Sequence, residues 1–158
     1  MTREAIERQL ADDAATWNEL TALLDAHPDV NLHAPGSKPW NSRDVFAHLA
    51  RWLDYSAARL DALVAGKPVP EAGNSVAEIN ARWEAEDASL SLAEARDRAF
   101  RAFATMERAV AAVPPAKWAG ELAETGRIEG ANHFREHLSY ITLSDPRPMP
   151  SPQQEEDA

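Results

Sequence analysis

Apolar residues recur every three or four positions along most of the chain, which is the spacing of amphipathic α-helices. No segment alternates apolar and polar residues over a length that favours a β-strand. The pattern therefore predicts an all-α protein, a four-helix bundle with one additional short helix. The expected helices cover residues 3–26, 41–65, a shorter stretch that begins at 75, 91–113 and 127–143.

Local signals set the ends of these helices. Pro28 and Gly66 end the first two. The second helix begins at a capping sequence, Asn41–Asp44, and the sequences Ser75–Glu78 and Ser91–Glu94 have the capping-box pattern that begins a helix. Residues 117–126, which carry Trp118, are expected to form a loop. The apolar residues expected to face inward near the two capping boxes are Val76, Ile79 and Trp83 in the short helix and Leu92 in the next one.

The length fits one domain. Residues 1–145 are expected to form the bundle, and residues 146–158, which are rich in proline and acidic residues, are expected to be disordered. The formal net charge of −10 argues against a nucleic-acid partner and against anionic membranes. No apolar run resembles a signal peptide or a membrane span, so a cytoplasmic protein is expected.

Three histidines are the strongest candidates for chemistry. His133 and His137 lie four residues apart and leave the same edge of one helix, and His48 lies at the margin of another apolar face. The chain has no cysteine, so a transition metal must be held by His, Asp or Glu. Three imidazoles that meet could hold a divalent ion and turn its water into a nucleophile near neutral pH.

The alternative is that these histidines make ordinary hydrogen bonds at helix margins. An HExxH metalloprotease is excluded, because Phe134 follows His133. If a metal is bound, carboxylates should orient the imidazole rings, and Glu136 and Asp44 are the acidic residues nearest in sequence.

Aromatic and amide side chains suggest a binding pocket beside the histidines. Trp40 and Trp118 fall in expected loops, where each ring either closes an end of the bundle or contacts a ligand. Tyr55 and Tyr140 follow His48 and His137 on the same helix edges, so either phenol could transfer a proton. The pocket for a small-molecule ligand is expected to be lined by Trp40, Trp52, Trp83, Asn80 and Asn132.

Three stretches carry a family resemblance. Residues 40–52 read WNSRDVFAHLARW, residues 79–83 read INARW, and residues 132–137 read NHFREH. Together they resemble the DinB-like four-helix-bundle superfamily, and within it most closely the ClbS/DfsB branch, over residues 3–142.

The resemblance implies a site and several activities. Many DinB-like proteins hold a divalent metal, often nickel or zinc, with three histidines placed as His48, His133 and His137 are here. Members of the superfamily include transferases and isomerases that use a thiol cofactor, mycothiol or bacillithiol. ClbS-like resistance proteins open a reactive cyclopropane by hydrolysis without a metal, and they carry a tyrosine where His48 stands here.

Three functions therefore stay open at this point. The first is a metal-dependent hydrolase or thiol-dependent transferase, acting in detoxification. The second is a metal-free, ClbS-like protein that hydrolyses or sequesters a reactive metabolite. The third is a non-catalytic interaction bundle that forms a homodimer through the alanine-rich faces of the helix over residues 91–113.

Overall fold

The described part of the chain is entirely helical. The computed structural model describes residues 2–29, 31, 38–73 and 75–144, and no strand occurs among them. This confirms the expected all-α fold, while the expected disordered tail over residues 146–158 lies outside the described residues. The helices are α1 (Arg3–Ala26), α2 (Ser42–Ala65), α3 (Val76–Glu86), α4 (Leu92–Ala112), the 3₁₀ turn η1 (Pro115–Lys117), α5 (Gly120–Ile128) and α6 (Ala131–Ser144).

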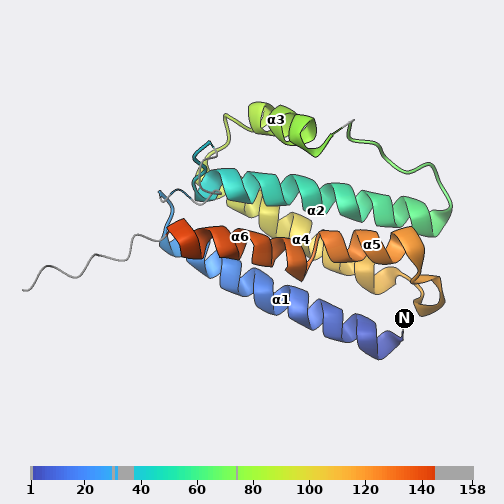
Figure 1. Ribbon diagram of the computed structural model, residues 1–158. Coiled ribbons are helices and arrows are strands. Elements are labelled where there is room, and N and C mark those ends of the chain that lie inside the picture. Colours follow the sequence, from blue (N-terminus) through green and yellow to red (C-terminus); the bar gives the residue numbers. More distant parts are fainter. Residues whose placement is uncertain (1, 30, 32–37, 74, 145–158) are drawn as a thin grey trace, which may run out of the picture.

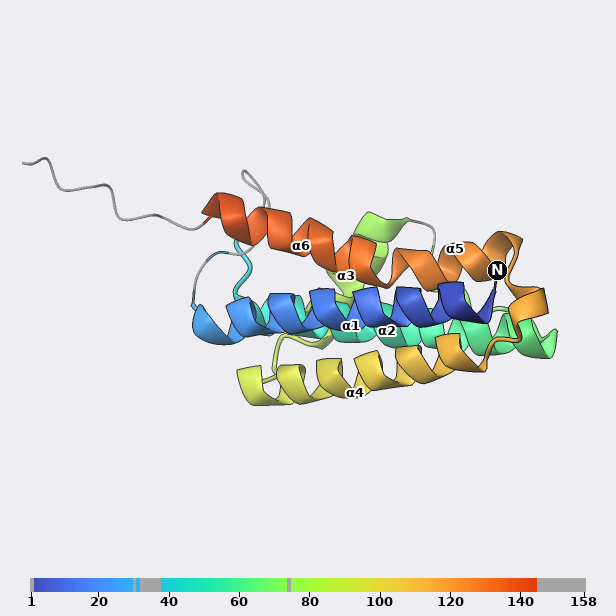
Figure 2. The ribbon, with the colours of Figure 1, turned by 90° about the horizontal axis from the view of Figure 1, so that it is seen from below.

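The bundle has four long sides. Three of them are α1, α2 and α4, and the fourth is formed by α5 and α6, which follow one another along the same side (Figures 1 and 2). The shorter α3 lies outside the bundle and packs on α2 (Figure 1). Among the helix pairs, α2 packs most extensively against α4, and α1 packs against both α4 and α6.

Side-chain caps begin the helices as the sequence predicts. The Asn41 side chain accepts a hydrogen bond from the Asp44 amide, and the Asp44 carboxylate accepts one from the Asn41 amide. Ser91 and Glu94 form the same reciprocal pair at the start of α4. At the end of α2, Gly66 takes the left-handed conformation (φ 65°) that a side chain would disfavour.

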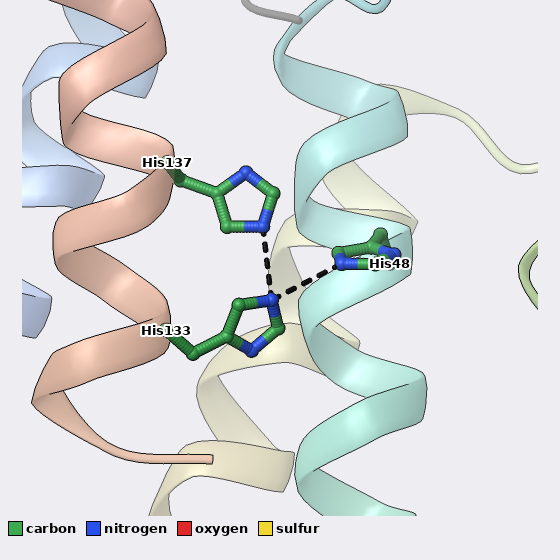
Figure 3. Close-up of side chains that lie close together, drawn as sticks. All are labelled: His48, His133 and His137. Atoms are coloured by element: carbon green, nitrogen blue, oxygen red, sulfur yellow. Dashed lines mark hydrogen bonds between the residues drawn. The ribbon is translucent and has the colours of Figure 1, made fainter. Parts of the chain in front are cut away.

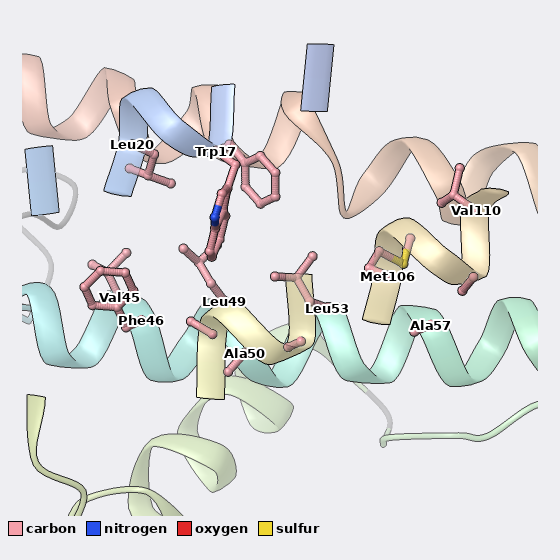
Figure 4. Close-up of a cluster of buried hydrophobic side chains, with 14 of the residues drawn as sticks. Trp17, Leu20, Val45, Phe46, Leu49, Ala50, Leu53, Ala57, Met106 and Val110 are labelled. Atoms are coloured by element: carbon pink, nitrogen blue, oxygen red, sulfur yellow. The ribbon is translucent and has the colours of Figure 1, made fainter. Parts of the chain in front are cut away.

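The core is apolar and continuous, and Figure 4 shows its central part between α1, α2 and α4. Trp17 of α1 is stacked on Phe103 of α4, with ring centroids 4.5 Å apart, and its ring lies 5.3 Å from that of Phe134 of α6. One indole thus joins three sides of the bundle. The largest side chains that are completely enclosed include Trp17, Phe46, Phe134, Leu20, Leu24, Leu49, Leu53 and Leu60.

Residues 117–126 are not a loop, as the sequence led us to expect. They hold the end of η1 and most of α5, and the last helix begins at Ala131 rather than at residue 127. The helical period is hard to see there, because α5 is only 9 residues long and its Leu122 and Ala123 are partly buried. Trp118 covers Gly126 so closely that a Cβ at position 126 would lie 2.7 Å from the indole.

Two expected core positions are exposed. Val76 is 61% exposed and Leu92 is 38% exposed. Each is the first residue of its helix, α3 or α4, where the backbone enters from a loop and the apolar stripe has not yet reached the core. The other two inward positions of α3 agree better, with Ile79 buried and Trp83 half-buried. None of the described helices is long and apolar enough to cross a membrane.

Candidate metal centre

The three histidines converge in space. The His133 Nε2 atom lies 3.3 Å from Nε2 of His48 and 3.1 Å from Nε2 of His137. Figure 3 shows His48 reaching from α2 toward the two rings that leave α6. One nitrogen from each residue falls within 4.8 Å of the other two. The fold therefore brings together two helix faces whose histidines are 85 residues apart in sequence.

A buried carboxylate orients the middle histidine. Glu129, whose side chain is 3% exposed, places Oε2 2.9 Å from Nδ1 of His133. Because a carboxylate accepts, the Nδ1 atom carries the proton, and Nε2 of a neutral His133 then turns its lone pair toward the other two rings. A metal-ligating histidine commonly has such a second partner.

Glu129 was not among the expected ring-orienting carboxylates, although it lies as near to His133 in sequence as Asp44 lies to His48. The two acceptors that we expected have other partners: Asp44 caps α2 and pairs with Arg43, and Glu136 accepts a hydrogen bond from the Tyr140 hydroxyl at 2.9 Å. The available signal was the spacing of four that links Glu129 to His133, the same spacing that links His133 to His137.

The first turn of α6 is anchored to α1. Asp13 is buried in α1, and its Oδ1 atom accepts a hydrogen bond of 2.7 Å from the Ala131 amide. Gly130 lies against this carboxylate, and a Cβ there would come within 2.6 Å of Oδ1. Burial raises the pKa of Asp13 to about 6, and the Ala131 amide opposes that rise. This contact fixes the helix that carries two of the three histidines.

An open cleft of about 530 Å³ lies beside the histidines. On its α2 side, the Trp40 ring packs 5.0 Å from that of His48, and Trp52 Nε1 donates a hydrogen bond of 2.8 Å to Oδ1 of Asn80 on α3. The cleft is lined by Trp40, His48, Trp52, Val76, Asn80, Glu129, Asn132, His133, Glu136, His137 and Tyr140.

Trp83 and Tyr55, which we expected at the same site, lie beside the cleft. Trp83 packs on Trp52 with ring centroids 5.1 Å apart and lines a smaller adjoining cavity. The Tyr55 hydroxyl donates to the Pro70 carbonyl at 3.1 Å and accepts from Arg59 at 3.2 Å. Tyr55 is not one of the described residues that line the cleft. Trp118 is buried, packs on Gly126 of α5 and does not line the cleft.

The donor set fits a transition metal. Zinc bound to imidazole has a metal–nitrogen distance of about 2.0–2.1 Å, so the nitrogens of a tetrahedral site lie about 3.3 Å apart. The two Nε2 separations at His133, 3.1 and 3.3 Å, are close to that value. All three ligand atoms lie within 4.8 Å of one another, a wider limit, so two of the three pairs match the tetrahedral spacing. Three neutral nitrogens with one side facing the cleft would leave a coordination position for a substrate or water.

Comparison with known protein families gave a match that covers most of the chain. The model of the DinB superfamily matches residues 13–141, which span α1 to α6 and include all three histidines. The chain belongs to the DinB superfamily. Searches for similar curated proteins and for similar solved structures gave no match. In this DinB-superfamily chain, the matched region also contains Asp13 and Glu129, the two carboxylates that support α6 and His133.

Proposed function

We propose that this DinB-superfamily chain is a metal-dependent enzyme that acts on a small molecule in the cleft between α2 and α6. The observation that carries the proposal is the convergence of three Nε2 atoms from His48, His133 and His137. These three residues would hold a divalent cation, nickel or zinc. When bound, the cation supplies a Lewis acid that activates a nucleophile or polarises an electrophilic substrate.

The surrounding residues of the chain would prepare this site. Glu129 keeps the proton of His133 on Nδ1, so that Nε2 faces the cleft. Asp13 holds the first turn of α6 against α1. Trp40 and Trp52 form an apolar wall that excludes water from one side of the reacting groups and contacts the substrate.

Two reactions fit such a site, hydrolysis and transfer of a thiol. In the first, water is the nucleophile that reaches the electrophile beside the histidines. In the second, the thiolate of a small cofactor takes the place of that water. Both fit detoxification of a reactive metabolite, which is the role suggested by the resemblance to the ClbS/DfsB branch.

A second candidate is a metal-free, ClbS-like protein. The same two Nε2 separations are hydrogen-bond distances, so a neutral His133 could accept from one neighbouring imidazole without any ion. In that case the imidazoles themselves would position water or a metabolite in the cleft.

Metal analysis separates the two candidates. We expect about one equivalent of nickel or zinc in protein that is purified without a histidine tag, and loss of that metal in the His137→Ala variant. His27→Ala, which removes a histidine at the end of α1 outside the cleft, should keep the metal. Wild-type protein without stoichiometric metal after incubation with either ion would exclude the metalloenzyme and leave the metal-free candidate.

A further inference from the structure

The cleft is lined by two acidic residues, one buried and one exposed, and by no lysine or arginine among the described residues. The two acidic residues are Glu129 and Glu136. Basic side chains around the cleft have acidic partners of their own: Arg43 of the adjoining cavity pairs with Asp44, and Arg135 of α6 pairs with Asp12 of α1. Lys38 likewise pairs with Glu84. Glu129 is buried against His133, so Glu136 is the carboxylate that faces solvent and a ligand.

Glu136 and Tyr140 form one unit on the exposed edge of α6. The Tyr140 hydroxyl donates its proton to Oε1 of Glu136 at 2.9 Å. Because the hydroxyl proton points to Glu136, both the hydroxyl oxygen and the carboxylate can act only as hydrogen-bond acceptors toward a ligand. The ring of Tyr140 also lies 6.2 Å from that of His137, so this acceptor pair borders the three histidines.

Aromatic rings border the same cleft. Trp52 is half-buried in the cleft wall, and Trp40 packs over His48. An indole face attracts a cation, and the attraction grows when water is excluded. A carboxylate, a phenol oxygen and indole rings around one opening form a set that binds a positively charged nitrogen and repels an anion.

We propose that Glu136 and Tyr140, together with the indole wall, form a subsite for a protonated amine on the substrate. The substrate class would then be a small organic amine that carries its reactive group toward the histidines and its ammonium toward Glu136. This inference rests on the proposed function, since it specifies the substrate of the same cleft. It assigns Tyr140 to substrate binding, in place of the proton transfer that its position in the sequence suggested.

Three ligands of nearly equal size test the subsite: benzylamine, benzyl alcohol and benzoate. Tryptophan fluorescence would be titrated with each ligand at pH 7 and low ionic strength, in chelator-treated protein and in protein given one equivalent of Zn²⁺. We expect benzylamine to bind about tenfold more tightly than benzyl alcohol, and benzoate to bind most weakly, in the chelator-treated protein. In that sample the amine nitrogen has no metal to coordinate, so its preference reports on the cleft alone.

Two variants with the same change in charge test whether the preference for benzylamine arises at Glu136. Glu136→Gln should bring benzylamine and benzyl alcohol to within about twofold of each other. Glu124→Gln removes an exposed carboxylate of α5 that does not line the cleft, and it should keep the wild-type ratio. Tyr140→Phe should weaken benzylamine by about two- to threefold, because one acceptor is lost.

Equal binding of the amine and the alcohol by wild-type protein would overturn the inference, as would equal losses in the two glutamine variants. Metal content is measured on the same samples. A protein that prefers the amine but binds no metal would contradict only the proposed metal dependence. A protein that binds the metal but shows no preference for the amine would contradict only the subsite.

Discussion

The two sides of α2 are built from the same helix and behave differently. Toward α4, Leu53 and Ala57 are almost completely buried, and small side chains let the two helices come close (Figure 4). On the side that faces the cleft, His48 reaches toward α6 and Trp52 packs against α3, and both are half-buried. The side toward α4 is closely packed with apolar side chains. On the other side, rings with polar nitrogens line an open cleft.

This difference indicates that one side of α2 stabilises the fold and the other side forms the candidate site. Each apolar contact in the interface between α2 and α4 stabilises the folded state. A cavity in that interface therefore lowers the free energy of unfolding. Imidazole nitrogens gain little from apolar contact and need a polar partner, which the opposing rings and Glu129 provide. The α4 side of α2 should therefore hold the bundle together, while the α6 side can stay open for a ligand.

The largest effect is expected on the packed side. Leu53→Ala should lower the free energy of unfolding by about 2–5 kcal/mol, because it leaves a cavity in a completely enclosed position. His48→Ala, one and a half turns away on the open side, should cost less than about 1 kcal/mol in metal-free protein. Urea unfolding followed by circular dichroism measures both. Equal losses would mean that the two sides of α2 contribute alike to stability.

An intermediate effect is expected where α1 supports the open side. The pKa of Asp13 in the folded protein is about 6, above the ordinary 3.8, so the folded state holds this proton more tightly than the unfolded state does. The stability contributed by the protonated form is complete below about pH 4 and is lost as the pH rises through 6.

Asp13→Asn should therefore gain stability relative to wild type between pH 4 and 7, by up to about 3 kcal/mol. The difference in unfolding free energy between variant and wild type, measured in urea at several pH values, tests this. Asp97→Asn, which changes an exposed carboxylate of α4, is the control and should show no such trend. A pH-independent difference for Asp13→Asn would show that this carboxylate is charged throughout.

The smallest effect is expected at the carboxylate behind His133. Glu129→Gln keeps the shape of the side chain but removes its charge, and it should weaken metal binding about tenfold to a hundredfold. Glu136→Gln has the same change in charge on the same side of the bundle, and it should change metal affinity by less than about threefold. Competition with a chromophoric chelator gives both affinities. Similar losses in the two variants would show that only the total charge of the cleft matters.

Much of the fold could be predicted because its signals are local. The caps at Asn41 and Ser91, together with the helical period, gave the bounds of α2 and α4 to within a residue or two. The helix α5 could not be found in this way, because Leu122 and Ala123, the partly buried apolar residues among those of α5 whose burial is described, are adjacent and reveal no period. Its helical state depends on packing against α2 and α6, which no local pattern records.

The candidate site also has parts that could be predicted from the sequence and parts that could not. The spacing of His133 and His137 fixes their common edge, and the apolar stripe of α2 places His48 at its margin, so their meeting could be expected from the sequence. Asp13 could not be expected, since its contact with Ala131 joins residues 118 positions apart. Tyr55 shares a helix edge with His48, but the Pro70 carbonyl and Arg59 engage its hydroxyl outside the cleft.

The contact between Asp13 and the start of α6 has a consequence for assembly. The first and last helices must dock before two of the three imidazoles are held in position, so the site is completed only when the two ends of the domain meet. An ion held at the proposed metal site would therefore stabilise the packing of α6 against α1. Fraying of α1 would then speed the release of the ion. The release rate would report how often α1 separates from α6.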